Sequence, residues 1–279
     1  ISLLHATMAS EACCRIPPVS ADYTPQGAWD TVADFKTYIA KSPTASESPK
    51  RGLIFLYDAF GFAPQILQGA DRLAALLGDD AVVILPDLLE GSHPEFTWLP
   101  ADTPEKQALV KGWFDAHGDY RRSKPKLLRA RGGGQAVPEH PKLGGVWALL
   151  GREAGVGRHI LGEFLLSFQM LHCYGVVHEH HNQLLGLLLT LYDSALDAAD
   201  AKALTVPHIV LASKDEPADV VAQYKEIIEG QLDKTGIVET YSTMAHGWMG
   251  VRAKLDVEED RKEYERGYQQ VAEFFNKYL

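Results

Sequence analysis

The chain has 279 residues, 46% of them hydrophobic, a formal net charge of −10 and a pI of about 5.5. This length is enough for one α/β domain with a sizeable core. The acidic balance, with no basic stripe, argues against nucleic-acid binding, and the absence of a long apolar run argues against a membrane span.

Processing and compartment can also be addressed from the composition. Residues 1–7 precede Met8 and lack the basic start and apolar core of a secretory signal. We therefore expect 1–7 to be a translated leader and 8–279 to form a single domain. The three cysteines, Cys13, Cys14 and Cys173, form no disulfide framework, so we expect a cytoplasmic protein.

The sequence of the first half predicts a polar N-terminal arm followed by alternating strands and helices. Residues 9–50 are polar, with one strand predicted at 35–40. A short apolar run at 52–57 has the length of a buried parallel strand and ends in a loop that begins with Asp58. Apolar residues at helical spacing predict a helix over 64–77, with Pro64 in its first turn.

Alternation continues through the rest of the chain, apart from its centre. Strands that alternate with helices indicate a mostly parallel central sheet with helices on both faces. Asp102 and Thr103 can cap the first helix of this half. The predicted strands are 81–86, 205–213 and 237–241, and the predicted helices are 103–116, 218–232 and 257–278.

Residues 121–192 differ from the rest in composition. This stretch holds none of the 19 aspartates, six of the 11 histidines, and nine Lys and Arg against four Glu. Codons can be chosen for residues 135–154 so that a one-base shift reads GYGLCWGG, which contains a Gly-x-Cys-x-Gly nucleophile elbow. We hypothesise that 125–192 is a non-native reading frame or intron. A genuine but divergent insertion is the alternative.

Two residues near strand ends are candidates for catalysis. Asp215 follows the strand at 205–213, and groups that act on ligands gather at the carboxyl ends of such strands. His246 lies on a glycine-flanked loop after the strand at 237–241. An acid followed by a histidine fits the order nucleophile, acid, base. A helix-capping aspartate and a surface histidine are the structural alternatives.

Other candidates carry weaker signals. Asp58 can influence the charge of a nearby thiol, and its loop amides can donate to an oxyanion, although it can also be a simple turn residue. Cys173 has half of an elbow pattern. Cys13 and Cys14 read as structural or incidental residues of the arm. A metal cluster is a further alternative, formed by His172, Cys173, His178, His180 and His181.

Four segments together resemble the fungal-type dienelactone hydrolase family of α/β-hydrolases. They are residues 13–19 (CCRIPPV), 57–61 (YDAFG), and the pair 211–217 (LASKDEP) and 246–252 (HGWMGVR). The resemblance covers about residues 10–120 and 195–279. It implies an α/β-hydrolase fold and a Cys-Asp-His mechanism on carboxylic esters or lactones, without metal or organic cofactor.

The resemblance also assigns roles to individual residues. It implies that Asp215 is the triad acid, His246 the base and Asp58 an acid near the cysteine, with Trp248 and Arg252 lining the substrate site. The family's elbow cysteine has no counterpart in this chain. A catalytically inactive member that binds a ligand or protein is therefore the alternative function. Loss of the elbow strand would also remove a middle strand unless residues 121–192 supply a substitute.

Overall fold

The computed structural model covers the chain with several internal gaps. Residues 1–10 and most of 118–200 lie outside the described part, so the expectations for the leader, for 125–192 and for the metal cluster fall largely outside it. The described residues are 11–32, 34–47, 49–117, 201–202, 207–231 and 235–278, with the backbone alone of 174–178 and 188–190.

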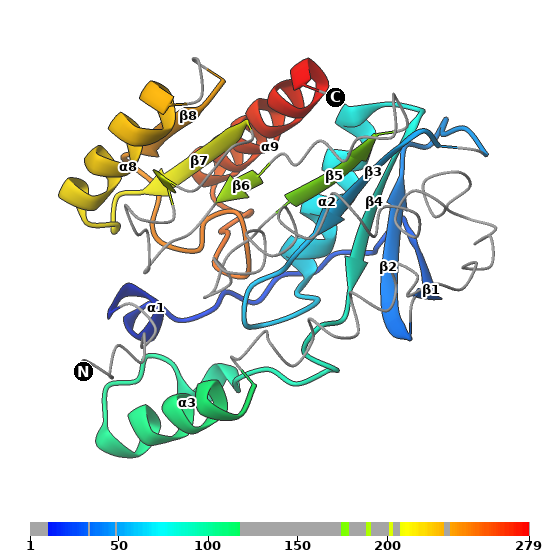
Figure 1. The fold of residues 1–279 in the computed structure, drawn as a ribbon. Helices are drawn as coiled ribbons and strands as arrows, with labels where there is room; N and C mark the ends of the chain where they lie inside the picture. Colours follow the sequence, from blue (N-terminus) through cyan, green and yellow to red (C-terminus); the bar gives the residue numbers. More distant parts are fainter. Residues whose placement is uncertain are drawn as a thin grey trace, which may run out of the picture.

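Two sheets run through the described part (Figure 1). One has the order β1-β2-β4-β3-β5 and the other the order β6-β7-β8. The first five strands are β1 (Ala28–Val32), β2 (Phe35–Lys41), β3 (Arg51–Phe55), β4 (Ala81–Pro86) and β5 (Tyr174–His178). The remaining strands are β6 (Leu188–Thr190), β7 (His208–Ser213) and β8 (Ile237–Tyr241).

Strand direction is mixed. The pairs β3–β4, β6–β7 and β7–β8 are parallel, whereas β1–β2, β2–β4 and β3–β5 are antiparallel. The strand β1, which the sequence analysis missed, forms a tight hairpin with β2 that pairs Val32 with Phe35. Its residues are largely exposed and do not alternate cleanly, so no period-2 pattern marks it.

The α-helices, apart from a short one at Glu11–Arg15 that was not predicted, begin and end close to the predicted positions. They are α1 (Glu11–Arg15), α2 (Pro64–Leu77), α3 (Pro104–His117), α8 (Ala218–Gln231) and α9 (Glu258–Tyr278). Pro64 occupies the first helical turn of α2, as expected, since its missing N–H would have no helical acceptor. The Thr103 hydroxyl accepts from the Lys106 amide at 3.3 Å, which confirms a cap at the start of α3.

Helices cover both faces of the sheet formed by β6, β7 and β8. Along β7, Ile209 and Leu211 join the core that contains α2 and α9, while Val210 and Ala212 join a second core with α8. Successive side chains of a strand point to opposite faces, so α8 and α9 lie on opposite sides. Each large aliphatic side chain buried in this way contributes roughly 1.5–3 kcal/mol.

The compositionally unusual segment supplies two of the strands. β5 pairs antiparallel with β3, in a register that joins Leu53 to Val176, and β6 pairs parallel with β7. A strand from the segment 121–192 therefore stands beside β3, where loss of an elbow strand would otherwise leave an open edge. The structure thus places strands of this segment beside β3 and β7.

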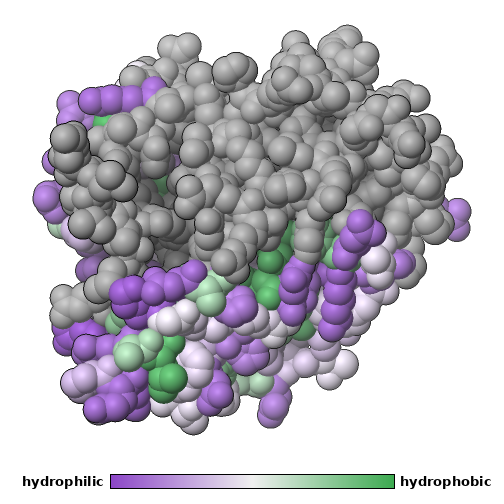
Figure 2. All heavy atoms as spheres, turned by 60° about the horizontal axis from the view of Figure 1, so that its bottom comes forward, coloured by the Kyte–Doolittle hydropathy of each residue, from purple (hydrophilic) through white to green (hydrophobic). Residues whose placement is uncertain are grey.

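The described surface is mainly polar. On the face drawn in Figure 2, hydrophobic side chains form small separate areas among hydrophilic ones. Exposed large hydrophobic residues in the described part include Trp29, Phe96, Leu109 and Val257. None of the described helices combines the length and apolar character needed to cross a membrane.

Candidate active site

The N-terminal arm is fastened to the rest of the domain by backbone and side-chain hydrogen bonds. The Val19 amide donates to the Val251 carbonyl at 3.0 Å, and the Ala101 amide donates to the Cys14 carbonyl at 2.8 Å. The buried Gln65 side chain donates to the carbonyl of Val19 at 2.7 Å. These contacts bring α1, at the start of the arm, against the loop that follows β8.

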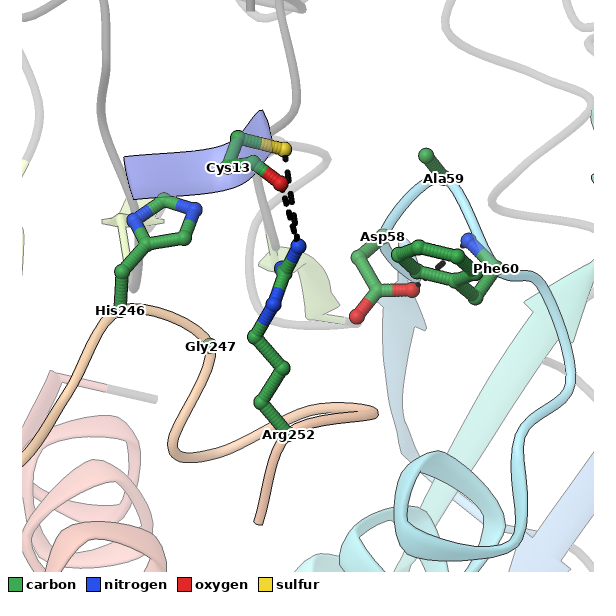
Figure 3. A pocket seen from close by; sticks show the side chains of 7 residues that line it. All are labelled: Cys13, Asp58, Ala59, Phe60, His246, Gly247 and Arg252. Carbon is green, nitrogen blue, oxygen red and sulfur yellow. Dashed lines mark hydrogen bonds between the residues drawn. The ribbon is translucent and has the colours of Figure 1, made fainter. Parts of the chain in front are cut away.

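A small pocket lies where this arm meets the loops after β3 and β8 (Figure 3). The loops after β3, β7 and β8 leave the carboxyl ends of strands that have parallel partners, which is the usual place for a site in an α/β sheet. The pocket is lined by Cys13, Asp58, Ala59, Phe60, His246, Gly247 and Arg252.

Cys13 lines this pocket, although nothing in the sequence assigned it a catalytic role. Its side chain is buried and shares the pocket with the imidazole of His246, which lowers the pKa of the thiol. Arg252 approaches it from another side: Nη2 lies 3.9 Å from the Cys13 Sγ and donates to the Cys13 carbonyl at 2.7 Å (Figure 3). The expectation of an incidental role for Cys13 therefore does not fit its surroundings.

The charges of the pocket shift two pKa values in opposite directions. Burial disfavours the Cys13 thiolate, but the His246 hydrogen bond and the Arg252 charge outweigh it, so the Cys13 pKa falls below 9.0. Burial likewise opposes protonation of His246, yet hydrogen bonds to Cys13 and Glu216 raise its pKa to about 9. Both shifts favour a thiolate–imidazolium pair over the neutral thiol and imidazole.

Two neighbouring carboxylates bind different parts of His246. The imidazole Nδ1 lies 2.9 Å from Oε1 of Glu216, which is itself buried and accepts from the Ser213 hydroxyl at 3.0 Å. Asp215 instead accepts the backbone amide of His246 at 2.7 Å. The ring is thus oriented by Glu216, whereas the sequence analysis expected Asp215 in that position.

Asp58 holds two loops together beneath the pocket. It accepts from the Phe60 amide at 2.9 Å and from the Val251 amide at 3.2 Å. The Phe60 amide is therefore already used by Asp58, so it is not the loop amide that could donate to an oxyanion. The Arg252 guanidinium, 5.5 Å above the Phe60 ring, is the cation that lines the pocket.

Gly247 allows Arg252 to reach the pocket. Its φ of +93° lies in the left-handed region, and a Cβ atom there would stand 2.6 Å from Cδ of Arg252. The backbone direction at Gly247 and the position of the Arg252 side chain therefore both require a residue without a Cβ atom. This gives a physical reason for glycine directly after the candidate histidine.

Of the two residues expected to line the substrate site, only Arg252 does so. The Trp248 ring is buried and stacks on Tyr241 with centroids 4.3 Å apart. It also packs closely over Gly267 of α9. The Trp248 ring therefore belongs to the core, where it packs between its own loop and α9. A sequence motif alone does not distinguish this packing role from a role in substrate binding.

Metal ligands are not assembled in the part of the chain that the structure describes. Over those residues, no three His, Cys, Asp or Glu side chains are grouped so that they could hold an ion. The side chains of the histidine-rich cluster from His172 to His181, and of Cys173, lie outside the described residues.

Comparison with known proteins identifies relatives of the whole chain. No family model matches. An uncharacterized AIM2 family protein of Schizosaccharomyces pombe is 32% identical over 231 residues, covering 82% of this chain and 84% of that protein. A second such protein from the same yeast is 26% identical over 260 residues, covering 92% of this chain and 94% of that protein.

A solved structure with the same fold is that of a candidate dienelactone hydrolase from Klebsiella pneumoniae subsp. pneumoniae MGH 78578. It is 17% identical, with a TM-score of 0.51, and the match covers 91% of this chain and 100% of that one. At this identity the likeness concerns the fold alone. It confirms the α/β-hydrolase fold that the sequence predicted.

Proposed function

The chain belongs to the AIM2 family, a dienelactone hydrolase-like family, and on that premise we propose that it hydrolyses carboxylic esters or lactones through a thiol-dependent acyl-enzyme. The observation that carries the proposal is the position of the His246 imidazole. The imidazole hydrogen-bonds the buried Glu216 carboxylate through Nδ1 and lines the same pocket as the Cys13 thiol, beside which its pKa is raised.

His246 acts as the general acid and base of the proposed reaction. An imidazole beside a thiol can take its proton and return that proton to the leaving group. Glu216 orients the ring and stabilises its charged form, which is the part that the acid of a triad plays. Asp215 fixes the backbone that carries the ring, so both carboxylates support the histidine, in different ways.

Arg252 and Asp58 shape the place where the acyl group binds. The Arg252 charge at the pocket wall favours negative charge on the substrate as the tetrahedral oxyanion forms. Asp58 holds the loop that carries Ala59 and Phe60 against the loop that carries Arg252. A small carboxylic ester or lactone is therefore the proposed partner, and no cofactor is needed for this chemistry.

The origin of the segment 121–192 and the location of the protein are separate proposals. We keep the hypothesis that 125–192 reflects a shifted reading frame or intron, and that the gene encodes a Gly-x-Cys-x-Gly elbow. Sequencing of the transcript tests it, and a message that matches this chain ends it. A cytoplasmic location, proposed from the sparse cysteines, is tested by imaging a tagged protein.

The direct test is hydrolysis of activated aryl esters and small lactones by the purified 279-residue chain. Turnover that His246→Ala lowers by about 100-fold or more, with the fold retained by circular dichroism, supports the proposal. If wild-type protein and His246→Ala release product at the same rate, the chain is not a hydrolase of this kind.

A further inference from the structure

The proposed reaction needs a nucleophile, and the sequence offers only three thiols. None of Cys13, Cys14 and Cys173 lies in a Gly-x-Cys-x-Gly segment, so motif matching assigns no nucleophile to this chain. A thiol attacks efficiently only where an imidazole can exchange its proton and a cation can favour its thiolate. Of the two cysteines that the structure describes, Cys13 and Cys14, it places the thiol of Cys13 in such surroundings.

Resting on the proposed hydrolase function, we infer that Cys13 is the nucleophile of this chain, with His246 as its proton partner and Arg252 as the cation beside its sulfur. The reacting groups therefore come from opposite ends of the chain. Cys13 is supplied by the N-terminal arm, and the other two by the loop after β8.

The position of Cys13 is fixed by its own backbone. Arg252 donates through Nη2 to the Cys13 carbonyl at 2.7 Å and through Nε to the Ile16 carbonyl at 2.7 Å. The carbonyl of Cys14 accepts from the Ala101 amide at 2.8 Å. The carbonyls of Cys13, Cys14 and Ile16 are thus all held, so the sulfur is presented to the pocket by a fixed segment, as a nucleophile requires.

The walls of the pocket indicate which substrates fit. Ala59 and the Phe60 ring form the side opposite His246, and Arg252 lies between (Figure 3). An acyl group with a small apolar part can lie on Ala59 and Phe60 while Arg252 faces its carbonyl oxygen. The inferred substrates are esters and lactones of short carboxylic acids.

The charged groups around the sulfur are unequal. His246 and Arg252 both favour the thiolate, and Nη2 of Arg252 lies 3.9 Å from the sulfur. Asp58 also lines the pocket, but its oxygens accept two backbone amides. The neighbouring Cys14 thiol is half-buried, and burial together with the Cys13 charge raises its pKa. The two adjacent cysteines therefore differ in reactivity, which makes Cys14 a matched control.

The inferred reaction is balanced by these residues and water. The Cys13 thiolate forms a C–S bond with the carbonyl carbon, and the C–O bond to the alcohol breaks as His246 donates its proton to the leaving oxygen. In a lactone this oxygen stays attached to the acyl chain. Water then attacks the thioester while His246 accepts a proton from it. The C–S bond breaks, and the acid and the thiolate are released.

The test compares Cys13→Ser with Cys14→Ser in the full chain, with an activated aryl ester such as p-nitrophenyl acetate. Initial rates give turnover, and peptide mass mapping of acid-quenched samples shows which residue carries the acyl group. We expect Cys13→Ser to lose about 100-fold or more of the turnover, Cys14→Ser to keep it, and the acyl group to map to Cys13.

The outcomes separate the two proposals. Turnover that persists in Cys13→Ser overturns Cys13 as nucleophile and leaves the hydrolase function standing. An acyl group that accumulates on Cys13 of the wild-type protein without turnover supports the nucleophile and overturns the hydrolase function. Neither turnover nor an acylated Cys13 overturns both.

Discussion

The imidazole of His246 is held by Glu216, with 2.9 Å between Nδ1 and Oε1, while the adjacent Asp215 binds only the backbone amide of the same histidine. Glu216 is buried and further fixed by the Ser213 hydroxyl. A carboxylate in this position selects the tautomer and stabilises the charged ring. The residue next to the expected acid therefore carries the contact that matters for proton transfer.

Substitution of the two carboxylates distinguishes their roles. We expect Glu216→Gln to lower kcat/KM for an activated ester by about 100-fold or more, because the charge that supports the imidazolium is removed. Asp215→Asn keeps an acceptor for the His246 amide and should cost less than about 10-fold. Steady-state kinetics on both variants shows which of the two carboxylates supports the imidazolium. A larger loss in Asp215→Asn would return the role of acid to Asp215.

The ionisation of Cys13 can be measured directly by the ultraviolet absorbance of its thiolate. In a Cys14→Ser, Cys173→Ser background, the thiol should ionise with a midpoint below pH 9.0, because His246 and Arg252 lower the Cys13 pKa. Adding Arg252→Gln should raise that pKa toward its ordinary value. Arg261→Gln, a change of an exposed arginine on α9, should leave the titration unchanged. Equal thiolate titrations in the two arginine variants would show that Arg252 does not lower the Cys13 pKa.

Much of the fold follows from local patterns in the sequence. The helix over Pro64–Leu77 and the strand over Ala81–Pro86 have the predicted bounds, since their apolar spacing and flanking residues are strong signals. The hairpin strand Ala28–Val32 was missed because it is largely exposed and has no clean alternation. The antiparallel β5 could not be predicted, since its pairing with β3 is set by contacts far apart in the chain.

The candidate site was predictable only where a motif carries it. His246, Asp58 and Arg252 reach one pocket, and each lies in a segment that the family resemblance marked. Cys13 lies in a marked segment too, but nothing local shows that the arm folds back against His246. Glu216 and Asp215 are adjacent acids, and only the direction of the backbone after β7 decides which one meets the ring.

Gly247 should be required for both stability and the position of Arg252. Gly247→Ala forces a side chain at φ +93° and a Cβ within 2.6 Å of Cδ of Arg252, so we expect a loss of about 1–3 kcal/mol in unfolding free energy. Gly112→Ala is the control, because this site on α3 has open space and alanine favours helix. Denaturant unfolding measures both, and equal effects would contradict a special role for Gly247.

Gln65 should couple the N-terminal arm to the pocket. Its Nε2 donates to the carbonyls of Val19 and Val251, so Gln65→Leu removes the Gln65 donor from the Val19 carbonyl and leaves Val251 only the Val19 amide; we expect a cost of about 1–3 kcal/mol. Alkylation of Cys13 by iodoacetamide should slow as well, because a looser arm holds the thiol less closely to His246 and Arg252, which lower its pKa. Gln269→Leu, on the exposed side of α9, should change neither quantity. Unchanged alkylation in Gln65→Leu would show that the arm is held by other contacts alone.

The most direct measurement is the pH dependence of kcat/KM for ester hydrolysis by the wild-type chain. A Cys13 thiolate paired with a His246 imidazolium gives activity that rises as the thiol ionises, at a pH below 9.0, and falls again as His246 loses its proton at a pH of about 9. An activity that instead rises through the ordinary pKa of histidine and stays level beyond pH 9 would contradict the pair.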